Sequence, residues 1–169
     1  MTIILERILE LERDFSNTRP RFIRQNDQGD AFVLLAFETV LNPYHGIRRL
    51  RNPRDLDLLE KYIIPPPDEG VDIFYQESDL EDRRFHVIQC KYSDLSPKEI
   101  RECFLLMKDT VEKYLKSPSN ISKNLRRLMS NSDFAEEYRD SCAYHVVHIG
   151  QTSSIANQPE SWNIVTSES

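Results

Sequence analysis

The stretch from Gly70 to Tyr92, which reads GVDIFYQESDLEDRRFHVIQCKY, constrains the fold more than any other part of the chain. Apolar residues alternate with polar ones in its first part and return from Phe85 onwards, whereas residues 78–83 are polar and rich in turn formers. This pattern is typical of two strands joined by a charged turn. We therefore predict a β-hairpin in this stretch.

The hairpin fixes which side chains meet across it. A turn centred between Leu80 and Glu81 places Asp72 opposite Gln89 in an antiparallel pair. Alternate residues of a strand share a face, so Gln89 and Lys91 point the same way. Directly opposed side chains lie about 5 Å apart, so Asp72 joins them on that face. An acid, an amide and an ammonium group are thus expected to converge on neighbouring strands.

Both faces of the predicted hairpin are apolar. On the face of Asp72 we expect Phe74, Phe85 and Val87. On the opposite face we expect Val71, Ile73 and Ile88. A strand that is apolar on both sides is usually central in its sheet and covered by helices. An unpaired charge there costs several kcal/mol, so Asp72 and Lys91 require partners or a ligand. Two interpretations stay open: a structural Asp72–Lys91 ion pair, or a metal site beside a catalytic lysine.

Length and composition favour one soluble globular domain. The chain has 169 residues, and we place the domain at residues 1–150, with a polar segment at 151–169 that could lead to further domains. No apolar run reaches the length of a membrane span, and charged residues interrupt the N-terminus, which excludes a signal peptide. The three cysteines, Cys90, Cys103 and Cys142, lack metal-ligand spacing and predict free, mostly buried thiols in a reducing, cytoplasmic compartment.

The remaining elements follow from periodicity and stop signals. Ser96, Pro97 and Glu99 form an N-cap, a first-turn proline and a capping-box acid, and they start a helix that Ser117-Pro118 ends. The other predicted elements are helices at 2–17 and 29–41, a short helix at 55–63, one or two helices within 120–138 and a strand at 142–149.

Charge is unevenly distributed along the chain. The net charge of −6 does not indicate nucleic-acid binding, because phosphate contacts usually come from Lys and Arg. One segment, residues 45–54, nevertheless holds four arginines: Arg48, Arg49, Arg51 and Arg54. It is either a solvated loop or a phosphate-contacting loop. Glu38, set among apolar residues of the helix predicted at 29–41, lies either on an exposed edge or against a partner.

The histidines do not predict a metal site. His145 and His148 lie three residues apart on a predicted strand and so point to opposite faces. His86 and Cys90 share a face but lie about 13 Å apart along their strand, which is too far for one ion. We interpret His145 and His148 as ordinary strand residues.

The ordered motifs resemble the PD-(D/E)XK nuclease superfamily. The resemblance is carried by Asp72, then the Gln89-Cys90-Lys91 tripeptide, with Phe37-Glu38 in an earlier helix, and it spans residues 29–150. Glutamine at the second position is similar to Mrr-like restriction enzymes and to the N-terminal nuclease domains of abortive-infection phage-resistance proteins. The resemblance implies an α/β, restriction-endonuclease-like αβββαβ core. Its mixed sheet is flanked by helices, and here an extra N-terminal helix precedes it. The superfamily also has a strand ahead of the aspartate strand, which the sequence does not locate.

The resemblance further implies a Mg²⁺- or Mn²⁺-dependent endonuclease that cleaves DNA in antiviral or restriction-type defence, alone or with a homodimer partner. Asp72 would be the principal ligand, joined by Glu38, the Gln89 amide oxygen and the Cys90 backbone carbonyl. Lys91 would orient or help deprotonate the attacking water. Two alternatives stay open: a catalytically silent interaction module and an RNase. The string from Arg139 to His145 resembles the RNase motif of HEPN domains, but it lies in a strand-like setting.

Overall fold

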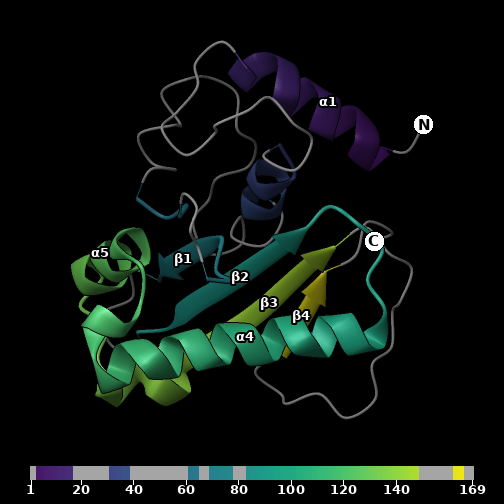
Figure 1. Cartoon of the computed structure of the whole chain (residues 1–169). Helices are drawn as coiled ribbons and strands as arrows, with labels where there is room; N and C mark the ends of the chain where they lie inside the picture. The colour runs from purple at the N-terminus through teal and green to yellow at the C-terminus, as the bar shows by residue number, and fades with distance from the viewer. Residues whose placement is uncertain are drawn as a thin grey trace.

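The computed structural model of the chain describes residues 3–16, 31–38, 61–64, 69–77, 83–148 and 162–165. Residues 31–38 are helical. The labelled elements (Figure 1) are the helices α1 (Ile3–Ser16), α4 (Pro97–Lys116) and α5 (Lys123–Asn131), the short 3-10 helices η1 (Pro118–Asn120) and η2 (Glu136–Ser141), and the strands β1 (Ile73–Gln76), β2 (Phe85–Lys91), β3 (Cys142–His148) and β4 (Trp162–Val165). The predicted loop at 45–54, with its four arginines, and residues 55–60 lie outside the described residues.

Within the described residues, a four-stranded mixed sheet has the order β1-β2-β3-β4. β1 and β2 pair antiparallel, whereas β2 with β3 and β3 with β4 pair parallel. Parallel neighbours require a crossover, and α4 makes the one between β2 and β3 (Figure 1). The predicted mixed α/β class is confirmed.

The sheet continues one pairing beyond β1. Ile63 forms an isolated antiparallel bridge with Ile73, the Ile64 amide donates to the Asp72 carbonyl, and the Phe74 amide donates to the Tyr62 carbonyl, both at 2.9 Å. The helix predicted to reach residue 63 is therefore wrong at its end, because the open edge of β1 takes up these backbone groups. Residues 62–64 lie where a strand before the aspartate strand is expected.

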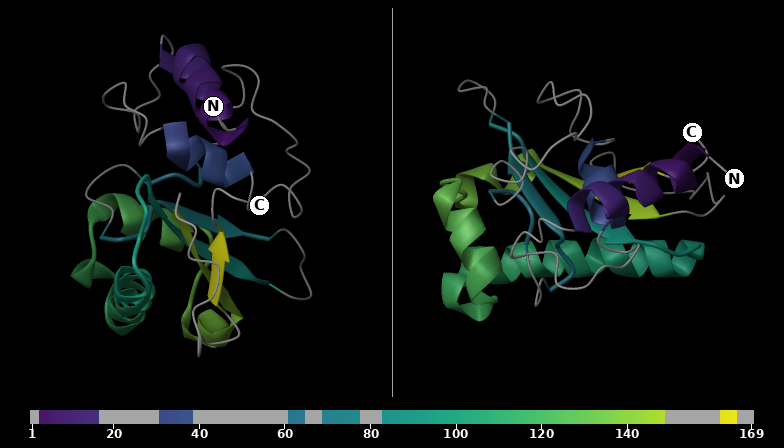
Figure 2. Two further views of the ribbon diagram at one scale, coloured as in Figure 1. Left: turned by 90° about the vertical axis from the view of Figure 1, so that its right-hand side faces the viewer. Right: turned by 90° about the horizontal axis from the view of Figure 1, so that it is seen from above.

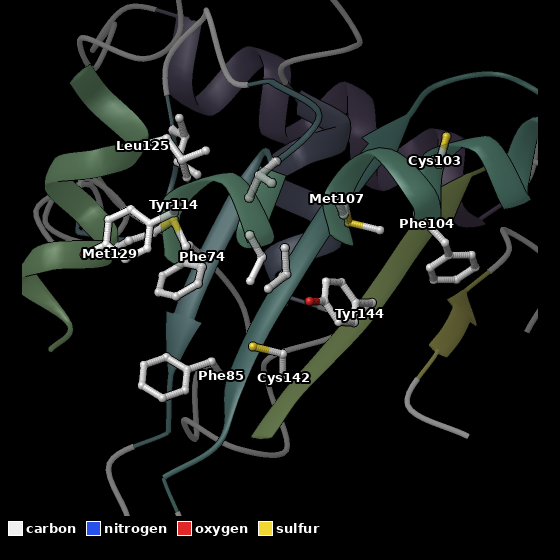
Figure 3. Close-up of a cluster of buried hydrophobic side chains, with 14 of the residues drawn as sticks. Phe74, Phe85, Cys103, Phe104, Met107, Tyr114, Leu125, Met129, Cys142 and Tyr144 are labelled. Carbon is white, nitrogen blue, oxygen red and sulfur yellow. The ribbon is translucent and has the colours of Figure 1, made fainter. Parts of the chain in front are cut away.

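Helices cover both faces of the sheet (Figure 2). α1 and the helix at 31–38 lie over one face, where Ile8, Phe37 and Ile88 share a buried cluster. α4 lies along the other face. The cluster there, which we call the α4-side cluster, includes Phe74, Phe85, Val87, Phe104 and Met107 (Figure 3). The two predicted apolar faces of the hairpin are thus both buried.

The predicted helix signals are confirmed. The Ser96 hydroxyl accepts from the Glu99 amide at 3.2 Å, the Glu99 carboxylate accepts from the Ser96 amide at 2.7 Å, and Ser117 caps the C-terminus of α4. All three cysteines are free, and Cys103 and Cys142 are buried. In the described part of the chain, no helix combines the length and apolarity needed to cross a bilayer.

The polar C-terminal segment holds an element that the sequence did not predict. β4 lies within residues 151–169 and pairs parallel with β3, with Val146 opposite Ile164. Its signal is only the tetrapeptide WNIV between polar stretches, too short to show a period. The free edge of β3 supplies the partner that makes this strand, so the segment contributes to the same sheet as residues 73–148.

Candidate functional site

The register of the hairpin is the one predicted. Ile73 lies opposite Ile88 and Gln76 opposite Phe85. Asp72 lies before this ladder, and its amide donates to the Ile88 carbonyl, so the predicted pair of Asp72 with Gln89 is not part of the register. Phe74, Phe85 and Val87 belong to the α4-side cluster, whereas Ile73 and Ile88 lie on the other face. Strand alternation therefore turns Gln89 and Lys91 towards the α4 side.

Alternation breaks just before β1, and Val71 is on the opposite side from the prediction. It belongs to the α4-side cluster. Glu69 and Gly70 have positive φ values of 52° and 86°, and the Asp72 amide donates out of register to the Ile88 carbonyl at 2.8 Å. A chain in this conformation is not an extended strand, so the two-residue period does not apply to it.

The turn that leads into Asp72 is held from several sides. The Thr110 hydroxyl of α4 donates to the Glu69 carbonyl at 2.8 Å, and the Glu69 carboxylate accepts from the Ser122 amide at 2.8 Å. A Cβ added to Gly70 would lie 2.5 Å from Cδ2 of the exposed Leu106 side chain, and the positive φ of Gly70 favours glycine. These contacts maintain a non-glycine left-handed residue next to the candidate site.

Asp72 closes the end of the β1–β2 ladder. Its Oδ2 accepts a hydrogen bond from the Cys90 backbone amide at 2.7 Å, where a strand carbonyl would otherwise accept. The carboxylate is thereby fixed beside the Gln89–Lys91 segment of β2. Its proximity to the tripeptide predicted from the sequence is confirmed, while its role as a metal ligand stays a prediction.

Gln89 and Lys91 each carry a polar group without a partner among the described residues. Gln89 is 4% exposed, and its Oε1 has no hydrogen-bond partner among the described residues. Lys91 is exposed, and no carboxylate of the described residues lies within ion-pair distance of its ammonium. The structural Asp72–Lys91 ion pair considered above is therefore not formed.

The pKa of the Cys103 thiol in α4 responds to the charges near the site. Burial raises the pKa of its thiol, while the positive charge of Lys91 lowers it and Asp72 is among the carboxylates that raise it. The charges of Lys91 and Asp72 thus act on the same position of α4. Lys91, Asp72 and the buried Gln89 form what we call the open cluster.

Glu38 lies in the other helical layer. It ends the described helix at 31–38, is buried, and forms an ion pair with Arg7 of α1 in which Arg7 Nε donates at 3.1 Å. The structure does not bring Glu38 onto the face of Gln89 and Lys91. The described residues contain no group of three His, Cys, Asp or Glu side chains able to hold a metal, and the predicted ligand set has only two of these side chains. The metal roles of Glu38, Gln89 and the Cys90 carbonyl stay predictions.

A second polar cluster, which sequence reasoning missed, lies near the hairpin turn. His86 Nδ1 is 2.9 Å from His145 Nε2, and His86 Nε2 is 2.6 Å from Glu77 Oε1. His86 and His145 are both buried. The three side chains form a hydrogen-bonded chain from the partly exposed Glu77 into the core, which we call the histidine chain.

The order of partners defines the protonation of the histidine chain. An ionised Glu77 can only accept, so His86 donates through Nε2 and accepts at Nδ1. His145 then donates through Nε2, and its own Nδ1 is a buried acceptor with no hydrogen-bond partner in the described structure. Burial lowers the pKa of both imidazoles, that of His145 to about 3, where the charge of His86 adds to the effect. Both rings are neutral at neutral pH.

Only the register of β2 against β3 reveals this chain. Ile88 lies opposite His145, which brings His86 and His145 onto the same face as diagonal neighbours. His148 lies opposite Lys91, on the other face from His145, as alternation predicted. The two strands are far apart in sequence, so the alternation within each strand could not supply the offset between them.

Comparison with known proteins finds no match: no protein-family model, no curated protein and no solved structure is similar to this chain.

Proposed function

We propose that the protein is a Mg²⁺- or Mn²⁺-dependent endonuclease that hydrolyses phosphodiester bonds of DNA, with the open cluster as its active site. The order of elements supports a restriction-endonuclease-like core. The helix at 31–38, the bridged segment at 62–64, β1, β2, α4 and β3 follow the αβββαβ order, with α1 as the extra N-terminal helix. The chemistry of the site, more than this order, carries the proposal.

The observation that carries the proposal is that the buried amide oxygen of Gln89 has no donor among the described residues. A buried amide oxygen without a donor costs about 1–3 kcal/mol. The acceptor lies one residue before the amide that holds the Asp72 carboxylate, a placement that makes sense when a ligand completes it. Hard divalent cations prefer carboxylate, amide and backbone carbonyl oxygens, which are the donors that Asp72, Gln89 and Cys90 offer. The donor set therefore fits Mg²⁺ or Mn²⁺.

Each residue then has a role defined by its position. Asp72 and Gln89 would hold the ion, which would polarise a phosphoryl oxygen and make a bound water more acidic. Lys91, exposed and without an ion-pair partner among the described residues, would orient that water and stabilise the charge that develops on the phosphate. Glutamine in place of an acid removes one negative charge, so binding of the ion would lean more on Asp72 and on the substrate phosphate.

One observation favours the alternative of a silent interaction module. The hydrogen bond from the Cys90 amide to Asp72 completes the β1–β2 ladder, which is a purely structural use of the carboxylate. On this alternative the site takes no metal. A saturating divalent ion should then leave the unfolding temperature unchanged, whereas a specific site raises it.

Cleavage of a supercoiled plasmid in Mg²⁺ or Mn²⁺, with EDTA as a blank, tests the proposal. We expect Lys91→Ala to lower the cleavage rate roughly 100-fold or more while the unfolding temperature stays at the wild-type value. Lys108→Ala, which removes an exposed lysine from α4, is the matched control and should cleave normally. A Lys91→Ala variant that cuts at the wild-type rate would remove Lys91 from the mechanism. RNA offered in place of the plasmid separates an RNase from a DNase.

A further inference from the structure

The helix α5 carries an isolated cluster of positive charge. Its sequence, KNLRRLMSN, contains three cations and no acid, in a chain with a net charge of −6. Lys123 and Arg127 are exposed and Arg126 is half-buried. None of the three forms an ion pair with a described carboxylate, whereas Arg7, Lys98, Lys113 and Arg139 all do.

The three cations share one side of the helix. Successive residues of an α-helix are about 100° apart, so positions i, i+3 and i+4 fall within a single stripe. Lys123, Arg126 and Arg127 have this spacing, and we call them the basic stripe. The opposite side of α5 is apolar and buried, with Leu125, Leu128 and Met129 in the α4-side cluster (Figure 3).

Helix stability does not explain the basic stripe. Cations are unfavourable near a helix N-terminus, where the macrodipole is positive, yet Lys123 is the first residue of α5. No acid within the helix offers an i,i+4 partner. The stripe thus holds concentrated positive charge that no described carboxylate pairs with.

A phosphate backbone fits this surface better than a membrane does. An amphipathic helix binds a bilayer through its apolar side, but the apolar side of α5 is committed to the protein core. Phosphate binding needs only exposed cations at intervals along a surface. Charge complementarity therefore favours nucleic acid.

The basic stripe is structurally linked to the open cluster. The Ser122 amide, one residue before Lys123, donates to the carboxylate of Glu69 at 2.8 Å. Asp72 follows Glu69 by three residues, a path of at most about 10 Å. α5 lies beside β1 at the edge of the sheet (Figure 1). A nucleic-acid strand bound to α5 would pass near the carboxylate.

We propose that the basic stripe of α5 binds the DNA phosphate backbone and guides the duplex to the open cluster. This inference rests on the proposed nuclease function and names the surface through which it engages its substrate. It predicts that binding and cleavage depend on different residues, with the basic stripe needed for both and Lys91 for cleavage alone.

Fluorescence anisotropy with a labelled DNA duplex in EDTA measures binding without cleavage. The charge-neutralised variant Lys123→Gln/Arg126→Gln/Arg127→Gln should lose roughly ten- to a hundredfold in affinity. Its slope of log affinity against log salt should be shallower by about 2–3, because each lost phosphate contact releases one counterion fewer. The matched control, Lys98→Gln/Arg101→Gln/Lys108→Gln on the exposed side of α4, removes the same charge and should retain the wild-type slope.

A charge-restoring variant, a folding check and alternative ligands distinguish the possible results of this binding experiment. Lys123→Arg/Arg126→Lys/Arg127→Lys should restore affinity if charge is what matters, and an unchanged unfolding temperature shows that each variant folds. An unaltered slope in the glutamine variant, or an equal loss in the α4 control, overturns the inference, as does a wild-type protein that binds no duplex. Binding of the basic stripe to RNA or to phosphatidylserine vesicles in preference to DNA also overturns it. If the duplex binds through α5 as expected but is not cleaved in Mg²⁺ or Mn²⁺, the proposed nuclease function is contradicted and the binding surface stands.

Discussion

The two polar clusters of the β1–β2 hairpin differ in how their central groups are partnered, although each keeps one buried acceptor without a partner among the described residues, His145 Nδ1 in the histidine chain and Gln89 Oε1 in the open cluster. In the histidine chain, His86 has a partner at each ring nitrogen, at 2.6 and 2.9 Å. In the open cluster, the Gln89 oxygen has no donor and Lys91 has no ion-pair partner among the described residues. The same strand, β2, carries both kinds of site.

This difference separates a structural role from a functional one. Buried polar groups are usually satisfied within the protein, and a satisfied network fixes the positions of its members. A buried acceptor left without a donor lowers stability, so we expect an external ligand to complete Gln89 Oε1, which lies one residue before the Cys90 amide that Asp72 accepts from. We therefore expect changes in the histidine chain to alter stability and changes in the open cluster to alter function.

The largest expected effect on stability comes from breaking the histidine chain. His86→Leu leaves the His145 Nε2–H buried without an acceptor and removes the donor to Glu77, so we expect the free energy of unfolding in urea to fall by about 2–3 kcal/mol. Ile88→Val, on the same face of the same strand, is the control for lost packing and should cost about 1 kcal/mol. Equal losses in the two variants would show that the hydrogen bonds contribute little.

The second-largest expected loss of stability comes from acidification of the histidine chain. Burial depresses the pKa of His145 to about 3, below its unfolded value near 6.5, so the unfolded state binds the proton more readily. The contribution of His145 to the free energy of unfolding is therefore fully present above pH 6.5 and is lost as the pH falls towards 3. At pH 5 the loss from this group is about 2 kcal/mol. The depressed pKa of His86 acts in the same direction. Urea unfolding at pH 7 and pH 5 measures the loss.

The variant His145→Gln serves as the control for this acid effect. It removes the titrating group, so the difference in unfolding free energy between pH 7 and pH 5 should shrink by the amount assigned to His145. If the wild-type protein and His145→Gln lose the same stability on acidification, other groups carry the pH dependence.

The smallest stability effect has the opposite sign and belongs to the open cluster. Gln89→Met keeps the volume of the side chain but removes the oxygen that has no donor among the described residues, so unfolding without divalent ions should require about 1 kcal/mol more. The same change should abolish the thermal shift that Mn²⁺ produces in the wild-type protein. A Gln89→Met variant that is destabilised and still responds to Mn²⁺ would mean that the amide oxygen is satisfied and is not a ligand.

Local signals predicted much of the hairpin and of α4. The turn centred between Leu80 and Glu81 set the register correctly, because residues joined by a short turn have one good pairing. Ser96, Pro97 and Glu99 marked the start of α4 because capping is a contact between near neighbours. The face of Val71 could not be predicted, since it depends on the left-handed turn at Glu69 and Gly70.

The sequence by itself placed an amide and an ammonium group on one face of the second strand and an acid at the start of its partner, because alternation and a short turn are local properties. Only the tertiary structure decided which partners they found. It left the oxygen of Gln89 without a donor among the described residues, set Glu38 against Arg7 in the other layer, and joined His86 to His145 through the parallel register of β2 and β3. These outcomes depend on contacts between segments far apart in the chain, whose offsets no local period encodes.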